Sequence, residues 1–178
     1  VRYRVMDRAQ KVEEPKGEVI VCPVNEKMLS SRIEVLSSEI LEKKKSLEEE
    51  EIIVVAGRGA QSEIGVSLCR KLAQALGGQL AFTRPMVENG YGDTAHQIGL
   101  SGRTVRPKLI ITCGVSGAIQ FTSCMNQSEC IVAINQNPEA QIFKTAHYCI
   151  TDDLYQVVPR LTELAVRRKE EEKDGLSL

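Results

Sequence analysis

The sequence predicts an α/β fold with a doubly wound, mostly parallel sheet and helices on both faces, a Rossmann-like arrangement. Three apolar runs rich in β-branched residues, Ile52–Ala56, Leu109–Cys113 and Cys130–Asn135, have the length of strands buried on both faces. Between the first two runs, aliphatic residues recur every four positions from Ile64 to Leu76, as on the apolar face of a helix. Strand and helix alternating in this way produce right-handed crossovers and a layered sheet.

The remaining elements follow from similar local signals. Gly77–Gly78 ends the first helix, and Leu80–Thr83 begins the next strand. The stretch Arg84–Val105 is rich in glycine and has little periodicity, so we expect a long loop that carries function. Tyr148–Ile150 is predicted to be a short last strand, and Pro159 suits the first turn of a final helix.

The two ends of the chain differ from this regular pattern. Residues 1–50 are expected to be lead-in strands and a charged helix from a preceding domain, and residues 51–178 the main domain. The lead-in elements are predicted at these positions: strands at Val1–Met6, Glu18–Val24 and Arg32–Leu36, and a helix at Ser37–Glu51. The charged tail from Arg167 onward is expected to fray. Because the chain starts at Val1 without Met, we expect a piece of a longer protein.

Composition excludes several classes of function. The 178 residues include 23 Lys and Arg against 24 Asp and Glu, so the net charge of -1 creates no broad positive field for nucleic acid. No apolar run is long enough to span a membrane, and the charged first twenty residues do not resemble a signal peptide. Six cysteines lack the spacing of a zinc site or a redox dithiol and are predicted to be reduced and buried.

Three polar clusters follow predicted strands, where ligands bind in sheets of this kind. Gly57-Arg58-Gly59 permits close backbone approach and offers a guanidinium for a phosphate. Gly114-Val-Ser-Gly117 opens a predicted helix, whose free amides and dipole would attract an anion. Asn135, together with Asp152 and Asp153 after the last strand, could accept hydrogen bonds from a ribose. Together the three clusters suit a dinucleotide.

Each cluster also has a purely structural interpretation. Gly57-Arg58-Gly59 is consistent with a tight turn that carries a surface arginine. The glycines of Gly114-Val-Ser-Gly117 are consistent with close helix packing, and Asp152 and Asp153 with helix capping. The sequence alone leaves these interpretations open.

Competing functions are weighed by the motifs they require. A complete Gly-x-Gly-x-x-Gly fingerprint followed by an acid is absent, which disfavours an ordinary NAD site, and no phosphate-loop lysine motif occurs. His96 and His147 have no nucleophile or carboxylate at a diagnostic spacing, so no catalytic residue and no metal site is assigned. The alternatives are an α/β domain that binds NAD or an adenine nucleotide as an enzyme or sensor, and an assembly domain whose site has decayed.

Three stretches of sequence carry a family resemblance. They are Gly114-Val-Ser-Gly-Ala-Ile-Gln120, then Ile131-Val-Ala-Ile-Asn135 with Pro138-Glu-Ala140, then Asp153-Leu154 with Val157-Val-Pro159. These stretches closely resemble the FAD-binding domain of the electron transfer flavoprotein alpha subunit, and the resemblance extends from Gly57 to about Leu164.

The resemblance implies an electron carrier rather than a classical substrate enzyme. The family holds FAD, accepts electrons from flavin dehydrogenases of the acyl-CoA dehydrogenase type and passes them to an acceptor oxidoreductase, with a beta subunit completing the heterodimer. It implies location in the bacterial cytoplasm, which we prefer, or in the mitochondrial matrix. Residues 51–178 would then be the FAD-binding domain.

Carried across position by position, the resemblance also implies which residues line the cofactor. They are Arg58, Thr83, Arg84, Ile98, Gly99, Leu100, Ser101, Ser116, Gly117, Ala118, Ile119, Gln120, Phe121, Asn135, Asp153 and Leu154. Arg84 would be the cation beside the isoalloxazine ring, where positive charge favours the reduced or anionic flavin. Ser101 would place its hydroxyl near the N5 side, Ser116 would serve the diphosphate or the ring edge, and Asn135 with Asp153 the adenosine end.

Three positions depart from the family pattern, namely Leu100, Ser101 and Phe121. The family usually has Gly-Gln-Thr-Gly where this chain has Gly99-Leu-Ser-Gly102, so a hydroxyl is kept and an amide is lost. The family usually has His where this chain has Phe121, which removes a possible donor to the pyrimidine oxygen of the flavin. These departures concern the potential of the flavin more than the fold.

Overall fold

The computed structural model describes residues 17–25, 33, 35–38 and 46–175. The chain divides into two compact units, one of them Asp7–Lys44 and the other including Lys45–Leu178. The described residues of the first unit form no helix or strand. The strands predicted at Glu18–Val24 and Arg32–Leu36 are therefore wrong for the positions described, and the strand predicted at Val1–Met6 lies outside them.

Exposure explains why these apolar runs do not form strands. Val19, Ile20 and Val21 are between 75% and 90% exposed, and Leu36 is 89% exposed. A β-branched run becomes a strand when a partner strand and a buried face are available. The described residues of this unit have neither.

The charged helix predicted at Ser37–Glu51 is also wrong where the structure describes it. Ser37 and Ser38 are not helical, residues 39–45 lie outside the described part, and only the 3₁₀ helix η1 (Leu47–Glu49) forms. Leu47 is 4% exposed and packs into the core of the larger unit. The carboxylate of Glu48 accepts a hydrogen bond from Arg103 Nη1 at 3.2 Å. The division into residues 1–50 and 51–178 stays a prediction.

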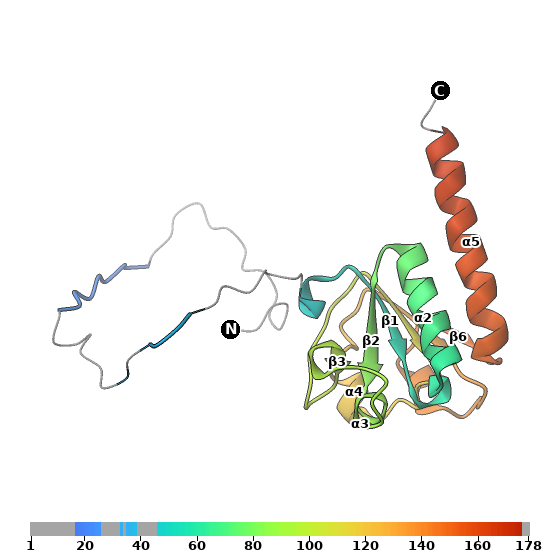
Figure 1. Cartoon of the computed structure of the whole chain (residues 1–178), viewed down its shortest axis with the longest axis horizontal. Helices are drawn as coiled ribbons and strands as arrows, with labels where there is room; N and C mark the ends of the chain where they lie inside the picture. Colours follow the sequence, from blue (N-terminus) through green and yellow to red (C-terminus); the bar gives the residue numbers. More distant parts are fainter. Residues whose placement is uncertain (1–16, 26–32, 34, 39–45, 176–178) are drawn as a thin grey trace. The chain divides into compact units, whose positions relative to one another are not determined.

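The larger unit contains a six-stranded sheet in which every neighbouring pair is parallel. Its order is β3-β2-β1-β4-β5-β6, the doubly wound order that the fold prediction calls for (Figure 1). The strands are β1 (Ile52–Ala56), β2 (Gln79–Thr83), β3 (Gln97–Ile98), β4 (Leu109–Cys113), β5 (Cys130–Ile134) and β6 (Tyr148–Ile150). The strand order reverses between β1 and β4, so their carboxyl ends open onto the switch point.

Alternating side chains of the strands supply two cores, one on each face. Val54 and Ala56 of β1 face the core shared with α2 (Glu63–Leu76) and α5 (Leu154–Gly175). Figure 1 shows these two helices side by side. Ile53 and Val55 face the opposite core, which α4 (Ile119–Thr122) and η4 (Gln141–Lys144) help to close. The predicted fold class, with helices on both faces, is confirmed, although the helices on the second face are short.

Two helices differ in detail from their predictions. In α2 the buried positions are Val66, Cys69, Leu72 and Ala73, whereas Ile64 is 68% exposed, because a row of every fourth residue drifts about 40° per step around the helix. Proline does not begin the last helix: α5 starts at Leu154 and Pro159 lies inside it.

The charged tail and the long loop also contain more structure than predicted. Helix α5 continues to Gly175, so the described part of the tail is helical. The stretch predicted as a loop holds α3 (Arg84–Glu88), η3 (Thr94–His96) and β3. The described cysteines are free: Cys69, Cys113 and Cys124 are buried as predicted, whereas Cys22 and Cys149 are exposed.

Candidate functional site

A cavity of about 870 Å³ lies at the carboxyl ends of the strands, across the switch point between β1 and β4. Its wall is built by the segments that follow β1, β2, β3, β4 and β5. Cavities of roughly 300–1,000 Å³ are typical of cofactor sites, and this position is where open α/β sheets bind ligands. In Figure 1 the short helices α3 and α4 lie at this end of the sheet.

Most of the residues predicted to line a cofactor lie in the cavity wall. They are Arg58, Thr83, Arg84, Ile98, Gly99, Leu100, Ser101, Ser116, Ala118, Gln120, Phe121 and Asn135. These residues come from segments that are far apart in the sequence, and the parallel sheet brings them together because all its strands end at the same edge. Whether each one touches a cofactor stays a prediction.

Four predicted residues are outside the wall. Gly117 and Ile119 belong to the same segment as the lining residues, and Ile119 is 75% exposed. Asp153 caps α5, since its Oδ1 accepts the Tyr155 amide at 3.0 Å, which is the capping role weighed against the ribose role. Leu154 is 5% exposed and packs in the core beneath α2 and α5.

The wall contains eight further residues, of which Gly59, Gly114 and Val115 belong to the polar clusters noted in the sequence and the others were not singled out as cofactor-lining. They are Gly59, Pro85, Gly114, Val115, Asn137, Glu139, Ala140 and Gln141. Pro85 follows two predicted residues directly. The segment from Asn137 to Gln141 overlaps the Pro138-Glu-Ala140 motif that contributed to the resemblance, so the motif was the available signal.

Three glycines let the backbones after β1 and β4 pack against each other beneath the cavity. The Gly57 amide donates to the Cys113 carbonyl at 2.9 Å, and the Gly59 amide donates to the Gly114 carbonyl at 2.9 Å. A Cβ at Gly57 would lie 2.6 Å from the Gly114 oxygen, and one at Gly114 would lie 2.7 Å from the Gly59 Cα. The glycines of the Gly-x-Gly turn therefore permit contact between two backbone segments, and close approach of a ligand to them stays a prediction.

Gly117 joins the segment after β4 to η4 on the far wall. Its φ is +89°, and a Cβ there would lie 2.1 Å from the Ile142 nitrogen. One residue earlier, the Ser116 carbonyl accepts the Ile142 amide at 3.1 Å. The two contacts hold the wall segments of the cavity together.

The segment from Gly114 to Ala118, where a helix was expected to begin, has no regular secondary structure, and this changes the origin of its anion-binding capacity. Only four residues, in α4, are helical, because Gly114 and Gly117 both adopt positive φ. A helix this short adds little dipole. Within the described part of the chain, however, the amides of Ser116, Gly117 and Ala118 have no hydrogen-bond acceptor. They are donors that a phosphate could use.

Arg58 adds a positive charge to the same region. It lies on η2 (Arg58–Ala60), directly after β1, and its side chain is exposed. Among the described residues its guanidinium forms no hydrogen bond or ion pair, so this group remains available to a ligand.

Thr83 supplies a buried hydroxyl that lacks a partner. It ends β2, is 7% exposed and lines the cavity. Its Oγ1 is buried without any hydrogen bond among the described residues. A buried hydroxyl left unsatisfied destabilises a fold, so a ligand atom that completes this hydrogen bond would be favoured.

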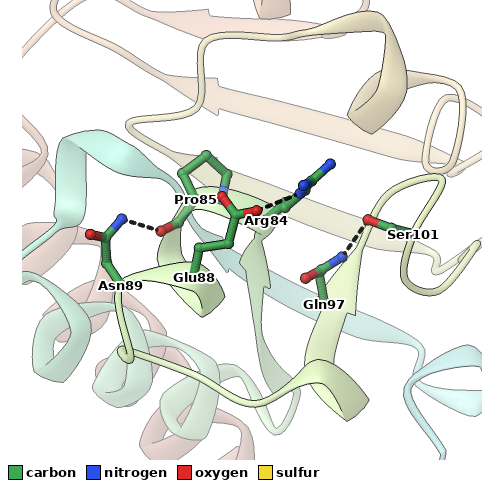
Figure 2. A network of polar contacts seen from close by, with 6 residues as sticks. All are labelled: Arg84, Pro85, Glu88, Asn89, Gln97 and Ser101. Carbon is green, nitrogen blue, oxygen red and sulfur yellow. Dashed lines mark hydrogen bonds and ion pairs between the residues drawn. The ribbon is translucent and has the colours of Figure 1, made fainter.

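Arg84 and Glu88 form an ion pair on α3 at the cavity edge. Arg84 Nε donates to Glu88 Oε1 at 2.7 Å, and the side chains are 67% and 55% exposed (Figure 2). The Asn89 side chain donates to the Pro85 carbonyl at 2.7 Å and closes the end of the helix. Arg84 therefore lines the cavity while its Nε is hydrogen-bonded to the Glu88 carboxylate.

The loop after β3 carries Ser101 on a framework of short hydrogen bonds. The buried side chain of Gln97 donates from Nε2 to Ser101 Oγ at 2.9 Å, as Figure 2 shows. The Leu100 amide donates to the Gln120 carbonyl at 3.0 Å, which ties this loop to α4. Gln97 was not singled out from the sequence.

The segment after β5 is organised by Asn135. Its Nδ2 donates to the Val115 carbonyl at 2.7 Å, and its Oδ1 accepts the Asn137 amide at 2.9 Å. The Asn137 side chain in turn accepts the Glu139 amide at 3.0 Å. Asn135 thus holds two wall segments together, and Glu139 adds an exposed carboxylate to the wall.

Phe121 has two environments. It lines the cavity, yet it is only 6% exposed and belongs to the core beneath η4. This burial favours a packing role for Phe121 over a role beside a flavin.

The pKa values of Asp93 and Cys113 are shifted, and neither residue lines the cavity. A hydrogen bond with the Cys69 thiol, together with burial, raises the pKa of Cys113 well above its ordinary value, so Cys113 remains a neutral thiol. Burial opposes ionisation of Asp93, but hydrogen bonds from His96 outweigh it and hold the pKa of Asp93 below its usual value. His96 Nδ1 lies 2.7 Å from Asp93 Oδ1.

The donor set fits an anionic dinucleotide. The free amides of Ser116–Ala118 and the Arg58 guanidinium suit a diphosphate, and the orphaned hydroxyl of Thr83 suits an acceptor on a ligand. No helix in the described part of the chain is long and apolar enough to cross a membrane. Among the same residues, no group of three or more His, Cys, Asp or Glu side chains could hold a metal.

Comparisons with known proteins agree with this chemistry. Residues 46–126 match the family model of the electron transfer flavoprotein FAD-binding domain. The chain is 43% identical over 176 residues to subunit LctC of the lactate dehydrogenase (NAD(+),ferredoxin) of Acetobacterium woodii, covering 98% of this chain and 41% of that protein.

Two relatives are named electron transfer flavoprotein subunit alpha. The protein from Thermoanaerobacterium thermosaccharolyticum is 43% identical over 165 residues, which are 92% of this chain and 50% of that protein. The protein from Bacillus subtilis is 49% identical over 117 residues, which are 66% of this chain and 36% of that protein. The chain thus spans half or less of the length of these curated relatives. It belongs to the electron transfer flavoprotein alpha-subunit family and contains that family's FAD-binding domain.

Proposed function

We propose that this domain holds FAD in the cavity at the switch point and uses it to carry electrons from a flavin dehydrogenase to an acceptor oxidoreductase. The observation that carries the proposal is that one cavity combines backbone amides, an arginine side chain and a buried hydroxyl that have no hydrogen-bond partner in the described part of the chain. The family membership supports FAD as the ligand of that cavity. When bound, FAD supplies the redox chemistry, and the chain supplies binding, orientation and electrostatics.

Different groups of wall residues suit different parts of the cofactor. Arg58 and the amides of Ser116–Ala118 would hold the diphosphate, because charge-assisted donors bind phosphate oxygens strongly. Thr83, Arg84 and Ser101 would contact the ring system from the segments after β2 and β3. The Glu88 carboxylate reduces the positive field that Arg84 presents, since the two groups form a close pair.

The adenosine end would lie by the segments after β5 and β6. Asn135 fixes the first of these segments, and its amide donates to the Ile150 carbonyl at the end of β6 at 3.1 Å. Asp153 and Leu154 follow β6 directly, so their backbone lies at the same edge of the sheet although their side chains are used in α5.

A beta subunit would complete the site. Leu100 is 69% exposed and Ile119 is 75% exposed, and both belong to segments that form the cavity wall. The hydrogen bond between the Leu100 amide and the Gln120 carbonyl brings these segments together. Apolar side chains in this position favour a second protein surface over water.

A second candidate role is as a subunit of a larger dehydrogenase complex. The relative whose match covers 98% of this chain is named as a subunit of a lactate dehydrogenase that uses NAD(+) and ferredoxin. In that case the bound FAD would exchange electrons within the complex, and the chain would be part of an enzyme rather than a separate carrier. The bacterial relatives also support the bacterial cytoplasm as the location that we propose.

The decisive experiment is identification of the cofactor in the chain coexpressed with its beta subunit. We expect FAD at one molecule per alpha chain, with the absorbance bands of a flavin. A colourless complex that takes up NAD would support the nucleotide-sensor alternative. A complex that binds the beta subunit but neither nucleotide would support the assembly-domain alternative.

A donor assay separates the two electron-transfer roles. The complex is mixed under anaerobic conditions with a reduced flavin dehydrogenase, or with lactate and the remaining subunits of a lactate dehydrogenase complex. Reduction of the bound FAD by the first mixture only supports the carrier, and reduction by the second only supports the complex subunit. Equilibrium dialysis with and without the beta subunit tests whether the partner strengthens FAD binding, as the exposed Leu100 and Ile119 imply.

A further inference from the structure

We propose that Gln97 is a positioning residue that turns the hydroxyl hydrogen of Ser101 toward the cofactor. The inference rests on the proposed function, because it assumes that FAD occupies the cavity lined by Ser101. It goes beyond that function by assigning a role to a buried residue that does not itself line the cavity.

The contact between the two side chains is direct. Gln97 begins β3, is 5% exposed, and donates from Nε2 to Ser101 Oγ at 2.9 Å (Figure 2). A hydroxyl has one hydrogen and two lone pairs, and an amide N–H can only donate. The bond therefore occupies a lone pair of Ser101 and leaves its hydrogen to point elsewhere.

The hydroxyl hydrogen of Ser101 can therefore point into the cavity. Ser101 lines the cavity, and its hydroxyl donates no hydrogen bond to any of the described residues. The edge of an oxidised flavin ring presents nitrogen and oxygen acceptors, so a donor at this position is complementary to it. If the Ser101 hydroxyl instead donated its hydrogen to the side chain at position 97, it would present a lone pair to the flavin acceptors and repel them.

The backbone of the loop is held independently of this side-chain bond. The Gly102 amide donates to the Gly99 carbonyl at 2.9 Å, and the Arg103 amide donates to the Gln97 carbonyl at 2.7 Å. A Cβ at Gly102 would lie 2.3 Å from the Gln97 carbonyl oxygen, which shows how closely the turn is packed. Replacing the Gln97 side chain should therefore change the direction of the hydroxyl more than the course of the loop.

Two substitutions separate orientation from packing. Gln97→Met keeps the length of the side chain and removes the hydrogen bond, so the Ser101 hydroxyl becomes free to rotate. Gln97→Glu keeps the shape but replaces the donor by an acceptor, which would draw the Ser101 hydrogen away from the cavity. Ser101→Ala removes the hydroxyl, and Gln79→Met is the matched control, because Gln79 begins the neighbouring strand and binds His96 at 3.1 Å outside the cavity.

The test uses the chain coexpressed with its beta subunit and measures the FAD dissociation constant and the midpoint potential of bound FAD. We expect Gln97→Met and Ser101→Ala to weaken binding by about two- to tenfold, the effect of one hydrogen bond. Gln97→Glu should weaken it more and shift the potential furthest, and Gln79→Met should match the parent. The double variant Gln97→Met/Ser101→Ala should be no weaker than Ser101→Ala alone.

Three results would overturn the inference. Additive losses in the double variant would show that Gln97 acts independently of Ser101. Parent-like affinity and potential in both Gln97 variants would show that the bond is structural only. A parent complex that binds no FAD would refute the proposed function as well, whereas the first two results leave that function standing.

Discussion

Replacing Thr83 by Val should have opposite effects on the stability of the empty domain and on its affinity for FAD. Valine has the shape of threonine without the hydroxyl. In the empty domain the Thr83 hydroxyl is buried and without a hydrogen bond among the described residues, so its loss removes an unfavourable group. In the FAD-bound domain the same hydroxyl should be satisfied by the ligand, so its loss removes a favourable contact.

The magnitudes follow from the burial of the hydroxyl. An unsatisfied buried polar group costs about 1–3 kcal/mol, so the empty Thr83→Val domain should be more stable by about 1 kcal/mol. One hydrogen bond to a ligand contributes roughly 0.5–1.5 kcal/mol, which corresponds to a two- to twelvefold loss of FAD affinity. Thr83→Val should therefore raise the stability of the empty domain and lower its affinity for FAD.

Urea denaturation of the empty domain and FAD titration of the complex with the beta subunit measure the two effects. Thr112→Val is the matched control, because Thr112 is fully buried on the neighbouring part of the sheet and its Oγ1 donates to the Val132 carbonyl at 3.4 Å. The control should lose a little stability and keep its FAD affinity. If Thr83→Val destabilises the domain as the control does, or binds FAD like the parent, the reasoning is wrong.

Three further substitutions test other parts of the site. Gly117→Ala should destabilise the domain by about 1–3 kcal/mol more than Gly90→Ala in urea denaturation, because both glycines have positive φ but a Cβ would meet the backbone only at Gly117; equal losses would contradict the steric argument. Arg58→Ala should weaken FAD binding by about tenfold or more and Arg58→Lys by less, and parent-like titrations of both would make Arg58 a surface residue. Phe121→His should raise the midpoint potential of bound FAD and lower the melting temperature, since an imidazole can donate to the ring but packs poorly in the core; an unchanged potential would leave Phe121 a packing residue only.

The bounds of several strands could be predicted from local sequence patterns. The strands Ile52–Ala56, Leu109–Cys113 and Tyr148–Ile150 have the predicted bounds, because each is a short apolar or β-rich run with polar or glycine neighbours. The same kind of run formed no strand at Val19–Val21, which is exposed and has no partner strand among the described residues. A strand pattern thus becomes a strand only when the rest of the chain provides a neighbour.

The position of the cavity could be predicted from the sequence, but the local structure of its wall could not. The carboxyl ends of parallel strands meet at one edge, so Arg58, Ser116 and Asn135 could be placed together from the order of the strands. The helix predicted from Gly114 is reduced to α4, because Gly114 and Gly117 adopt positive φ and Gly117 packs closely against Ile142, a residue distant in sequence. Contacts between separate segments decide such details, and a single sequence does not show them.

Individual side-chain partners were the least predictable feature. Asp153 caps α5 in the structure, and a carboxylate after a strand has the same sequence signal whether it caps a helix or binds a ribose. Gln97 donates a hydrogen bond to Ser101, and the Thr83 hydroxyl has no partner among the described residues. Both features depend on side-chain rotamers and burial, which a sequence does not show.

The central claim, that the cavity at the switch point holds FAD, is tested most directly by amide hydrogen exchange. The complex with the beta subunit is compared with and without FAD, and exchange is followed across residues 114–121 and, as a control, around Gly90. We expect FAD to slow exchange at Ser116, Gly117 and Ala118, whose amides have no acceptor among the described residues, and to leave exchange at Gly90 unchanged. Tight FAD binding without any slowing at these three amides would show that the cofactor is held elsewhere.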